Sequence, residues 1–314
     1  HRIAYLLYHD RENLKSSNIL VLSPNGVFAD YISHILPELG EENIREMSFD
    51  LFAYRELKGI AADCEDRYDQ IERVIICPES QELCRKNSQQ NCRQAGCFML
   101  GMEDDLMNFK DVEYKGCILK EKEIIDLFYF KFLDIPLLSR MEAVAEYFID
   151  QVETLRDRDL ADEEKEELTE RFQRMYETRD CYILYSRFLE QEGYKALPRL
   201  PLEKRKLRYE DVYPILYLKY SLFRCKGHHG IKHVVVDEMQ DYSWIQFVLL
   251  KKLFPCKMTI LGDKAQTMEE QQQDVLKFLP KIFGRDIRKI VMNRSYRNTM
   301  EIAQYANRLT VSRI

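Results

Sequence analysis

Two short apolar runs, each ending in acidic residues, place the strongest constraint on the fold of this chain. Residues 233–236 (His-Val-Val-Val) lead into Asp-Glu, and residues 257–261 lead into Gly-Asp. Runs this short, with no alternation of polar residues, are typical of strands that are buried on both faces of a sheet. The segment between them, around Trp244 and Phe247, has apolar residues at helical spacing. Strand, helix and strand at this spacing predict a βα unit within a parallel sheet.

The N-terminal part of the chain carries a similar signal. Residues 18–22 form an apolar run that stops at Ser-Pro-Asn-Gly, which predicts another buried strand. A helix is expected before it, with Ile3, Leu6 and Leu7 on one face, and a second helix after it over residues 27–36. Residues 73–77, which stop at a proline, are a further candidate strand.

The middle of the chain has a different character. Apolar residues recur at steps of three and four over residues 137–152, and residues 209–223 are rich in Tyr and Leu, so both segments are predicted to be helices. The acidic run at residues 162–167 is interpreted as a solvated helical face. We therefore expect a mostly helical insertion between two halves of one sheet.

Composition limits the class of protein. The net charge of −6, from 47 basic and 53 acidic residues, argues against coating nucleic acid by bulk attraction, although a local basic groove stays compatible with it. The sequence has no apolar run of 18 residues, so no membrane-spanning helix is expected. Its nine cysteines include no CxxC pair, which indicates reduced thiols in a cytoplasmic protein.

The most specific motif is Asp237-Glu238-Met239-Gln240-Asp241, directly after the strand at residues 233–236. Carboxylates at the carboxyl end of a buried strand lie where open α/β sheets bind ligands. In a nucleotide hydrolase one carboxylate holds Mg²⁺ and another orients the attacking water. The alternative for an isolated Asp-Glu pair is an ordinary helix N-terminus.

Two further motifs follow in order. A strand ends in Gly262-Asp263, and Gln266 three residues later could donate an amide hydrogen bond to a phosphate oxygen. The third motif is Tyr296-Arg297, where an arginine from a neighbouring domain could offset charge on a transferred phosphoryl group. The alternatives are a strand-ending turn for the second motif and a helix start for the third.

In this order the three motifs resemble superfamily 1 helicases of the UvrD/Rep type. The segment at residues 20–25 with Phe28, the Tyr-Glu-Asp stretch at residues 209–211 and the Ser-Tyr-Arg order at residues 295–297 are similar to the HelD-like branch. That branch acts on bacterial RNA polymerase, besides any action on DNA. The resemblance covers residues 1–75 and 205–314, and the middle of the chain is only loosely matched.

The resemblance implies a role for each matching residue. Asp237 would bind Mg²⁺ and Glu238 would be the catalytic base. Gln240 and Gln266 would sense the γ-phosphate of ATP. Asp241 would contact the nucleotide, Tyr296 would stack on the adenine and Arg297 would act as an arginine finger. The residues implied to contact nucleic acid are Ser23, Asn25 and Phe28.

Two departures from the family pattern matter. The sequence contains no GxxxxGK[ST] phosphate-binding loop, so we expect that the chain begins downstream of that loop and shows negligible ATPase activity in isolation. After Gln266 the sequence runs Thr-Met-Glu-Glu-Gln, without the aromatic residues that stack on single-stranded bases in the UvrD type. This favours a HelD-like role.

The sequence therefore predicts an α/β fold, a RecA-like parallel sheet of the P-loop NTPase type with a large helical insertion. Residues 1–77 and 228–290 would form the RecA-like core, residues 78–227 the insertion, and residues 291–314 the start of a second RecA-like domain. The predicted function is an ATP-dependent and Mg²⁺-dependent translocase that acts on DNA or RNA polymerase. The alternatives are a DNA-unwinding helicase and a non-catalytic binding module that retains the fold.

Overall fold

The computed structural model describes residues 2–10, 12–23, 45–77, 82–225, 227–263, 275–284 and 287–292, together with residues 302, 304 and 305. The chain divides into two compact units. The first, here called the sheet unit, comprises His1–Met47 and His229–Ile314, and the second, the helical unit, comprises Ser48–His228.

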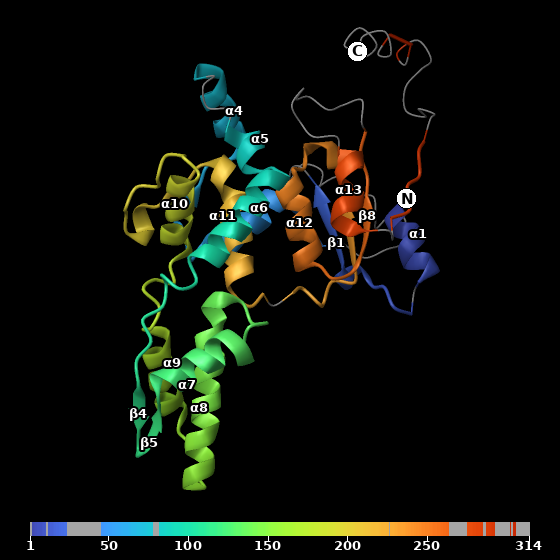
Figure 1. Ribbon diagram of the computed structural model, residues 1–314. Helices are drawn as coiled ribbons and strands as arrows, with labels where there is room; N and C mark the ends of the chain where they lie inside the picture. The colour runs from blue at the N-terminus through green and yellow to red at the C-terminus, as the bar shows by residue number, and fades with distance from the viewer. Residues whose placement is uncertain are drawn as a thin grey trace. The chain divides into compact units, whose positions relative to one another are not determined.

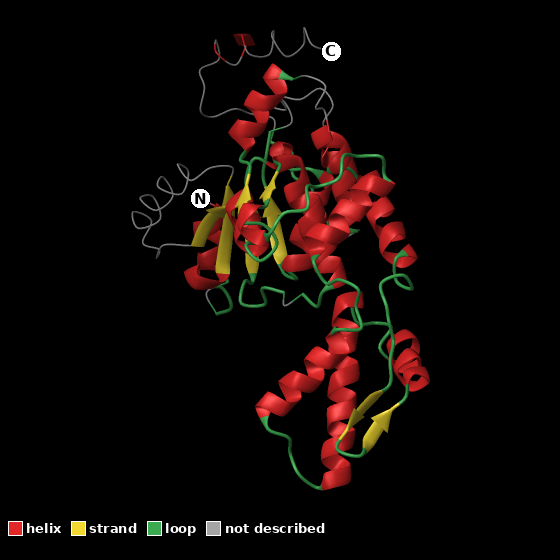
Figure 2. Ribbon diagram, turned by 90° about the vertical axis from the view of Figure 1, so that its left-hand side faces the viewer, coloured by secondary structure: helices red, strands yellow, loops and turns green. Residues whose placement is uncertain are grey.

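The sheet unit is built on a four-stranded sheet with the order β2-β1-β7-β8. Strand β1 pairs with β7 and β7 pairs with β8, both in parallel, with Leu22 opposite Val236 and Val236 opposite Ile260. The four strands are visible side by side in Figure 2. The strands span Ile19–Ser23 (β1), Arg45–Ser48 (β2), His233–Val236 (β7) and Lys257–Ile260 (β8). The predicted mixed α/β fold with a parallel sheet is confirmed.

Strands β1 and β7 are buried along their whole length, as their apolar sequences predict. Helix α12 (Trp244–Leu253) packs against α13 (Val275–Phe283), next to it in Figure 1. The Phe278 ring lies 5.3 Å from Trp244 and 5.8 Å from Phe247, centroid to centroid. The sheet unit also contains α1 (Arg2–His9) and the short helices η1 (Ser16–Asn18) and η5 (Met239–Asp241). The helices predicted around Leu6 and around Trp244 are therefore confirmed, whereas the one over residues 27–36 lies outside the described residues.

The helical unit contains most of the helices and only short β-ladders. Strand β3 (Asp63–Cys64) pairs in parallel with β6 (Lys206–Leu207), and β4 (Val112–Tyr114) pairs antiparallel with β5 (Cys117–Leu119). The helices are α3 (Phe49–Leu57), α4 (Arg67–Ile76), α5 (Glu82–Lys86), α6 (Gln89–Gly101), α7 (Glu121–Asp126), η2 (Leu127–Lys131), η3 (Leu137–Ser139), α8 (Arg140–Arg156), α9 (Asp162–Gln173), α10 (Cys181–Gln191), η4 (Leu202–Lys204) and α11 (Tyr209–Leu222).

The helices predicted over residues 137–152 and 209–223 are confirmed by α8 and α11. The strand predicted over residues 73–77 is wrong, because residues 73–76 form the last turn of α4 and Cys77 is its C-cap. Asp66 caps the N-terminus of α4 by accepting a hydrogen bond from the Asp69 amide at 2.8 Å. The apolar side chains that suggested a buried strand are on the surface, with Ile75 74 % and Ile76 83 % exposed.

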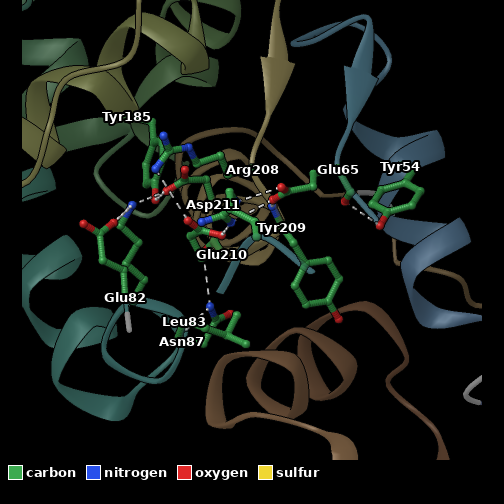
Figure 3. A network of polar contacts seen from close by, with 12 residues as sticks. Tyr54, Glu65, Glu82, Leu83, Asn87, Tyr185, Arg208, Tyr209, Glu210 and Asp211 are labelled. Atoms are coloured by element: carbon green, nitrogen blue, oxygen red, sulfur yellow. Dashed lines mark hydrogen bonds and ion pairs between the residues drawn. The ribbon is translucent and has the colours of Figure 1, made fainter. Parts of the chain in front are cut away.

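The first turn of α11 is held by buried ion pairs (Figure 3). Lys86 Nζ lies 2.8 Å from Asp211 Oδ1, which also accepts a hydrogen bond from the Tyr185 hydroxyl at 2.7 Å. Arg73 donates to Glu65 at 2.9 Å and to Glu210 at 2.6 Å. These contacts join α11 to α4, α5 and α10. Glu210 and Asp211 also lie at the N-terminus of α11, where the helix macrodipole favours negative charge.

Hydrogen bonds between tyrosines and carboxylates join α11 to α3. The hydroxyls of Tyr209 and Tyr213 both donate to Asp50 Oδ1, and the Tyr220 hydroxyl donates to Glu56 Oε2 at 2.5 Å. Burial raises the pKa of Asp50, and this outweighs the opposing effect of the two tyrosine hydroxyls. These hydrogen bonds hold α3 against α11 within the helical unit.

None of the helices in the described part of the chain is both long and apolar enough to cross a membrane. The predicted domain boundaries at residues 77, 227 and 290 stay predictions. The compact units describe how the chain packs, with the change from sheet unit to helical unit at Met47 and back at His229.

Candidate functional site

The ends of β1, β7 and β8 meet at one edge of the sheet. The Asp237 amide donates to the Leu22 carbonyl at 2.9 Å, and the Leu261 amide donates to the Val236 carbonyl at 2.8 Å. These bonds continue the parallel register one residue past each strand. They bring Ser23 at the end of β1 and the residues that follow β7 and β8 to the carboxyl edge, where open α/β sheets bind ligands.

Glu238 adopts an uncommon backbone conformation at this edge, with φ 50° and ψ 53° in the left-handed region. Its amide donates to Asp237 Oδ1 at 3.0 Å, and its carboxylate accepts a hydrogen bond from Gln240 Nε2 at 2.5 Å. Both side chains, Asp237 and Glu238, are half-buried, whereas Asp241 is exposed. The two carboxylates therefore follow β7 directly, and each accepts a hydrogen bond within this turn.

Gln240 connects this turn to the end of β8. Its side chain is only 5 % exposed, and its Oε1 accepts a hydrogen bond from the Asp263 amide at 3.1 Å. The Met239 amide donates to the Leu261 carbonyl at 2.8 Å. The segments that follow β7 and β8 are thus joined by one backbone bond and one side-chain bridge.

Gly262 makes this close approach possible. A Cβ at this position would lie 2.4 Å from Met239 Cγ, 2.5 Å from Gln240 Oε1 and 2.9 Å from the Met239 amide nitrogen. The first two atoms belong to side chains, but the third is backbone and has little freedom to move. Residue 262 therefore has to be glycine because no space remains for a Cβ atom.

Gly262→Ala is expected to destabilise the sheet unit by about 1–3 kcal/mol, the range for inserting a methyl group into a well-packed site. The new methyl group has to push the turn at Met239 away from β8, because a backbone atom is among its nearest neighbours. Thermal unfolding followed by circular dichroism measures the effect. Gly230→Ala is the matched control, since a Cβ there meets no atom within 4 Å. Equal stability of both variants would contradict the close contact.

Ser243 begins helix α12 directly after the site. Its amide donates to Gln246 Oε1 at 2.7 Å and its hydroxyl donates to the same atom at 2.8 Å, in a capping box. Ser243 therefore caps α12, whereas Glu238 occupies the N-cap position of the short helix η5 without a side-chain cap hydrogen bond. The helix-start alternative for the Asp237-Glu238 pair therefore stays open.

Glu46 in β2 is a site residue that the sequence did not indicate. Burial raises the pKa of its carboxyl group, the Ser23 hydroxyl opposes this rise, and the nearby Asp237 carboxylate adds to it. Ser23, at the end of β1, is only 1 % exposed. A lone glutamate in a four-residue strand belongs to no motif, so no sequence pattern could indicate it.

The structure brings together part of the predicted site. Asp237, Glu238, Gln240 and Ser23 follow or end adjacent strands, and the Asp241 amide donates to the Glu238 carbonyl at 3.0 Å. The other predicted site residues lie outside the described part of the chain, namely Asn25, Phe28, Gln266, Tyr296 and Arg297. Their roles stay predictions.

The residues at this edge fit a magnesium ion that is shared with a nucleotide. Mg²⁺ uses one or two protein carboxylates and otherwise water and phosphate oxygens, and Asp237 provides a half-buried carboxylate at the strand end. In the described part of the chain, no group of three or more His, Cys, Asp or Glu is placed to form a protein-only metal site. Asp237 would hold the ion.

A parallel sheet with carboxylates at its carboxyl edge is the arrangement that α/β nucleotide hydrolases use to hold Mg²⁺ and phosphate. The family model of the UvrD/REP helicase N-terminal domain matches residues 1–268 of the 314. The chain therefore belongs to the UvrD/REP helicase family, whose members are ATP-dependent helicases. No curated protein sequence matches this chain.

Proposed function

We propose that this chain is the ATP-hydrolysing part of a HelD-like superfamily 1 translocase that remodels RNA polymerase, DNA or both, in the cytoplasm. Asp237 holds Mg²⁺, and Glu238 orients and deprotonates the water that attacks the γ-phosphate. The observation that carries the proposal is the pair of half-buried carboxylates at the edge where β1, β7 and β8 end.

The two carboxylates have different environments, which suits two different roles. Asp237 continues the β7 backbone, and its Oδ1 accepts a hydrogen bond from the Glu238 amide, which fixes the direction of its side chain. Glu238 has a left-handed backbone conformation, and its carboxylate accepts a hydrogen bond from Gln240 that restrains it. A bound magnesium ion would neutralise charge on the phosphate oxygens. The protein itself then has to position one water, which is the role of Glu238.

The remaining site residues extend the proposal by resemblance. Gln266 lies three residues after Asp263, which contacts Gln240. It would contact the γ-phosphate, Tyr296 would stack on adenine and Arg297 would act as the arginine finger. Asn25 and Phe28, with Ser23, would face nucleic acid.

The choice of RNA polymerase over strand separation rests on one sequence feature. Residues 267–271 (Thr-Met-Glu-Glu-Gln) contain no aromatic side chain, and two of the five are acidic. Base stacking on aromatic side chains drives single-strand binding in the unwinding type, and acidic side chains repel phosphates. A translocase that acts through a protein partner does not need such a stacking surface.

The experiment that tests this choice is ATP turnover by the natural polypeptide, with single-stranded DNA or with bacterial RNA polymerase core enzyme. We expect polymerase to bind the protein and to raise turnover more than DNA does. Strong stimulation by single-stranded DNA, with strand separation and no binding to polymerase, would favour the unwinding helicase. Absence of ATP binding and turnover under every condition would favour a non-catalytic module.

A further inference from the structure

We propose that Gln240 is a positioning residue that transmits movement of the segment after β8 to the carboxylate of Glu238. The inference rests on the proposed function, in which Glu238 orients the attacking water. It assigns to Gln240 an action through Glu238 in place of direct contact with the γ-phosphate.

Both ends of the Gln240 side-chain amide form hydrogen bonds, one to an acceptor and one to a donor. Nε2 donates to Glu238 Oε2 at 2.5 Å, and Oε1 accepts from the Asp263 amide at 3.1 Å. Exchanging the oxygen and nitrogen of this amide would set a carbonyl against a carboxylate and an NH₂ group against an N–H. The orientation is therefore fixed by its two neighbours.

The Gln240 side chain, which joins Glu238 to Asp263, has little space in which to move. Gln240 is 5 % exposed, and its Oε1 would lie 2.5 Å from a Cβ placed on Gly262. The Met239 amide is bonded to the Leu261 carbonyl in the same place. A shift of residues 261–263 therefore has to move the Gln240 side chain or break its hydrogen bond.

The conformation of Glu238 makes the direction of its carboxylate sensitive to such a shift. Its left-handed backbone conformation is uncommon for a residue with a side chain and has to be maintained by its surroundings. The hydrogen bond from Gln240 is a direct restraint on its carboxylate. When residues 261–263 move, the restraint changes, and so does the direction in which Glu238 presents its oxygens.

Two variants distinguish the hydrogen bond from Gln240 to Glu238 from the hydrogen bond that Gln240 accepts from the Asp263 amide. Gln240→Glu keeps an oxygen for the Asp263 amide but replaces the donor to Glu238 by a second carboxylate. Gln240→Met has a similar length and removes both hydrogen bonds. Gln191→Glu, at an exposed position that ends α10, is the control for the change in charge.

The expected result in the natural polypeptide is a fall in kcat for ATP hydrolysis of about 10- to 100-fold in both Gln240 variants, as for other residues that orient a reacting group. KM for ATP should stay within about twofold, because no contact to the nucleotide is lost. Amide hydrogen exchange gives the second measurement. The Asp263 amide should exchange about tenfold faster in Gln240→Met than in Gln240→Glu, and the Met239 amide should be unaffected.

A normal kcat in Gln240→Met would overturn the inference, as would a loss that appears in KM alone, since the latter indicates direct contact with the nucleotide. Unchanged exchange of the Asp263 amide in Gln240→Met would do the same. Comparison with Glu238→Gln distinguishes this failure from failure of the proposed function. If Glu238→Gln is inactive and Gln240→Met is normal, only the inference fails, whereas an active Glu238→Gln overturns both.

Discussion

Replacing Glu238 by glutamine is expected to lower ATP turnover by about 10²- to 10⁴-fold, the contribution typical of a general base. The amide of glutamine keeps the size of the side chain but cannot take a proton from water. Binding of Mg²⁺ and ATP should persist, because Asp237 and the backbone around it are unchanged. Steady-state phosphate release by the natural polypeptide measures turnover, and a fluorescent ATP analogue measures binding.

The control for this prediction is Glu203→Gln, which makes the same change at an exposed position in η4. It should leave turnover unchanged. Turnover of Glu238→Gln within a few-fold of the unmodified protein would remove Glu238 from the mechanism. A loss of ATP binding that equals the loss of turnover would show that the residue binds the nucleotide.

The second large effect is expected in the helical unit, where Lys86→Met should destabilise the fold by about 3–5 kcal/mol, the usual result of leaving a buried charge without its partner. Lys86 is 3 % exposed, and its ammonium group is 2.8 Å from the Asp211 carboxylate. Burial lowers the pKa of Lys86, but Asp211 and Glu82 outweigh this effect, so that the pKa is raised and the group is charged at neutral pH. Urea unfolding of the helical unit measures the loss.

Arg174→Met provides the matched control, since Arg174 pairs with Glu170 on the surface and the two side chains are 76 % and 64 % exposed. Such a pair contributes about 0–1 kcal/mol. The double variant Lys86→Met with Asp211→Asn should recover part of the lost stability, because the buried charge is then removed as well. Equal stabilities of Lys86→Met and Arg174→Met would show that the buried pair does not hold α11.

The sequence was sufficient to predict the sheet and the carboxylates at its edge. Strands β1 and β7 are buried on both faces, so their residues have to be apolar throughout, and this requirement is visible without a structure. The polar residues that follow each strand are then placed by the parallel register. Asp237 and Glu238 were found in this way.

Helix α4 shows where apolar runs mislead. Residues 74–76 look like a strand, but in α4 the polar Gln70 is buried and Arg73 pairs with Glu65 and Glu210, while Ile75 and Ile76 face outward. A short run of apolar residues therefore indicates a buried strand only where those same side chains pack in the core. Here a polar network, made by residues distant in sequence, determines which face of the helix is covered.

Gly262 and Glu46 show a different limit. The need for glycine at residue 262 arises from Met239 and Gln240 in η5, which follows another strand. The raised pKa of Glu46 arises first from burial, and Asp237, 191 positions away in the sequence, adds to it. Both depend on distances between segments that only the fold brings together. A sequence pattern identifies residue types at fixed spacing, and neither residue belongs to one.

Iron-mediated backbone cleavage can locate the metal ion of Mg²⁺–ATP, which we propose to lie at the carboxyl edge of the sheet. Fe²⁺ replaces Mg²⁺ with ATP bound, and ascorbate with peroxide then cleaves the polypeptide next to the metal. The account predicts ATP-dependent cleavage close to Asp237 and close to residues 261–266, suppressed by excess Mg²⁺. Cleavage confined to other segments, or independent of ATP, would contradict it.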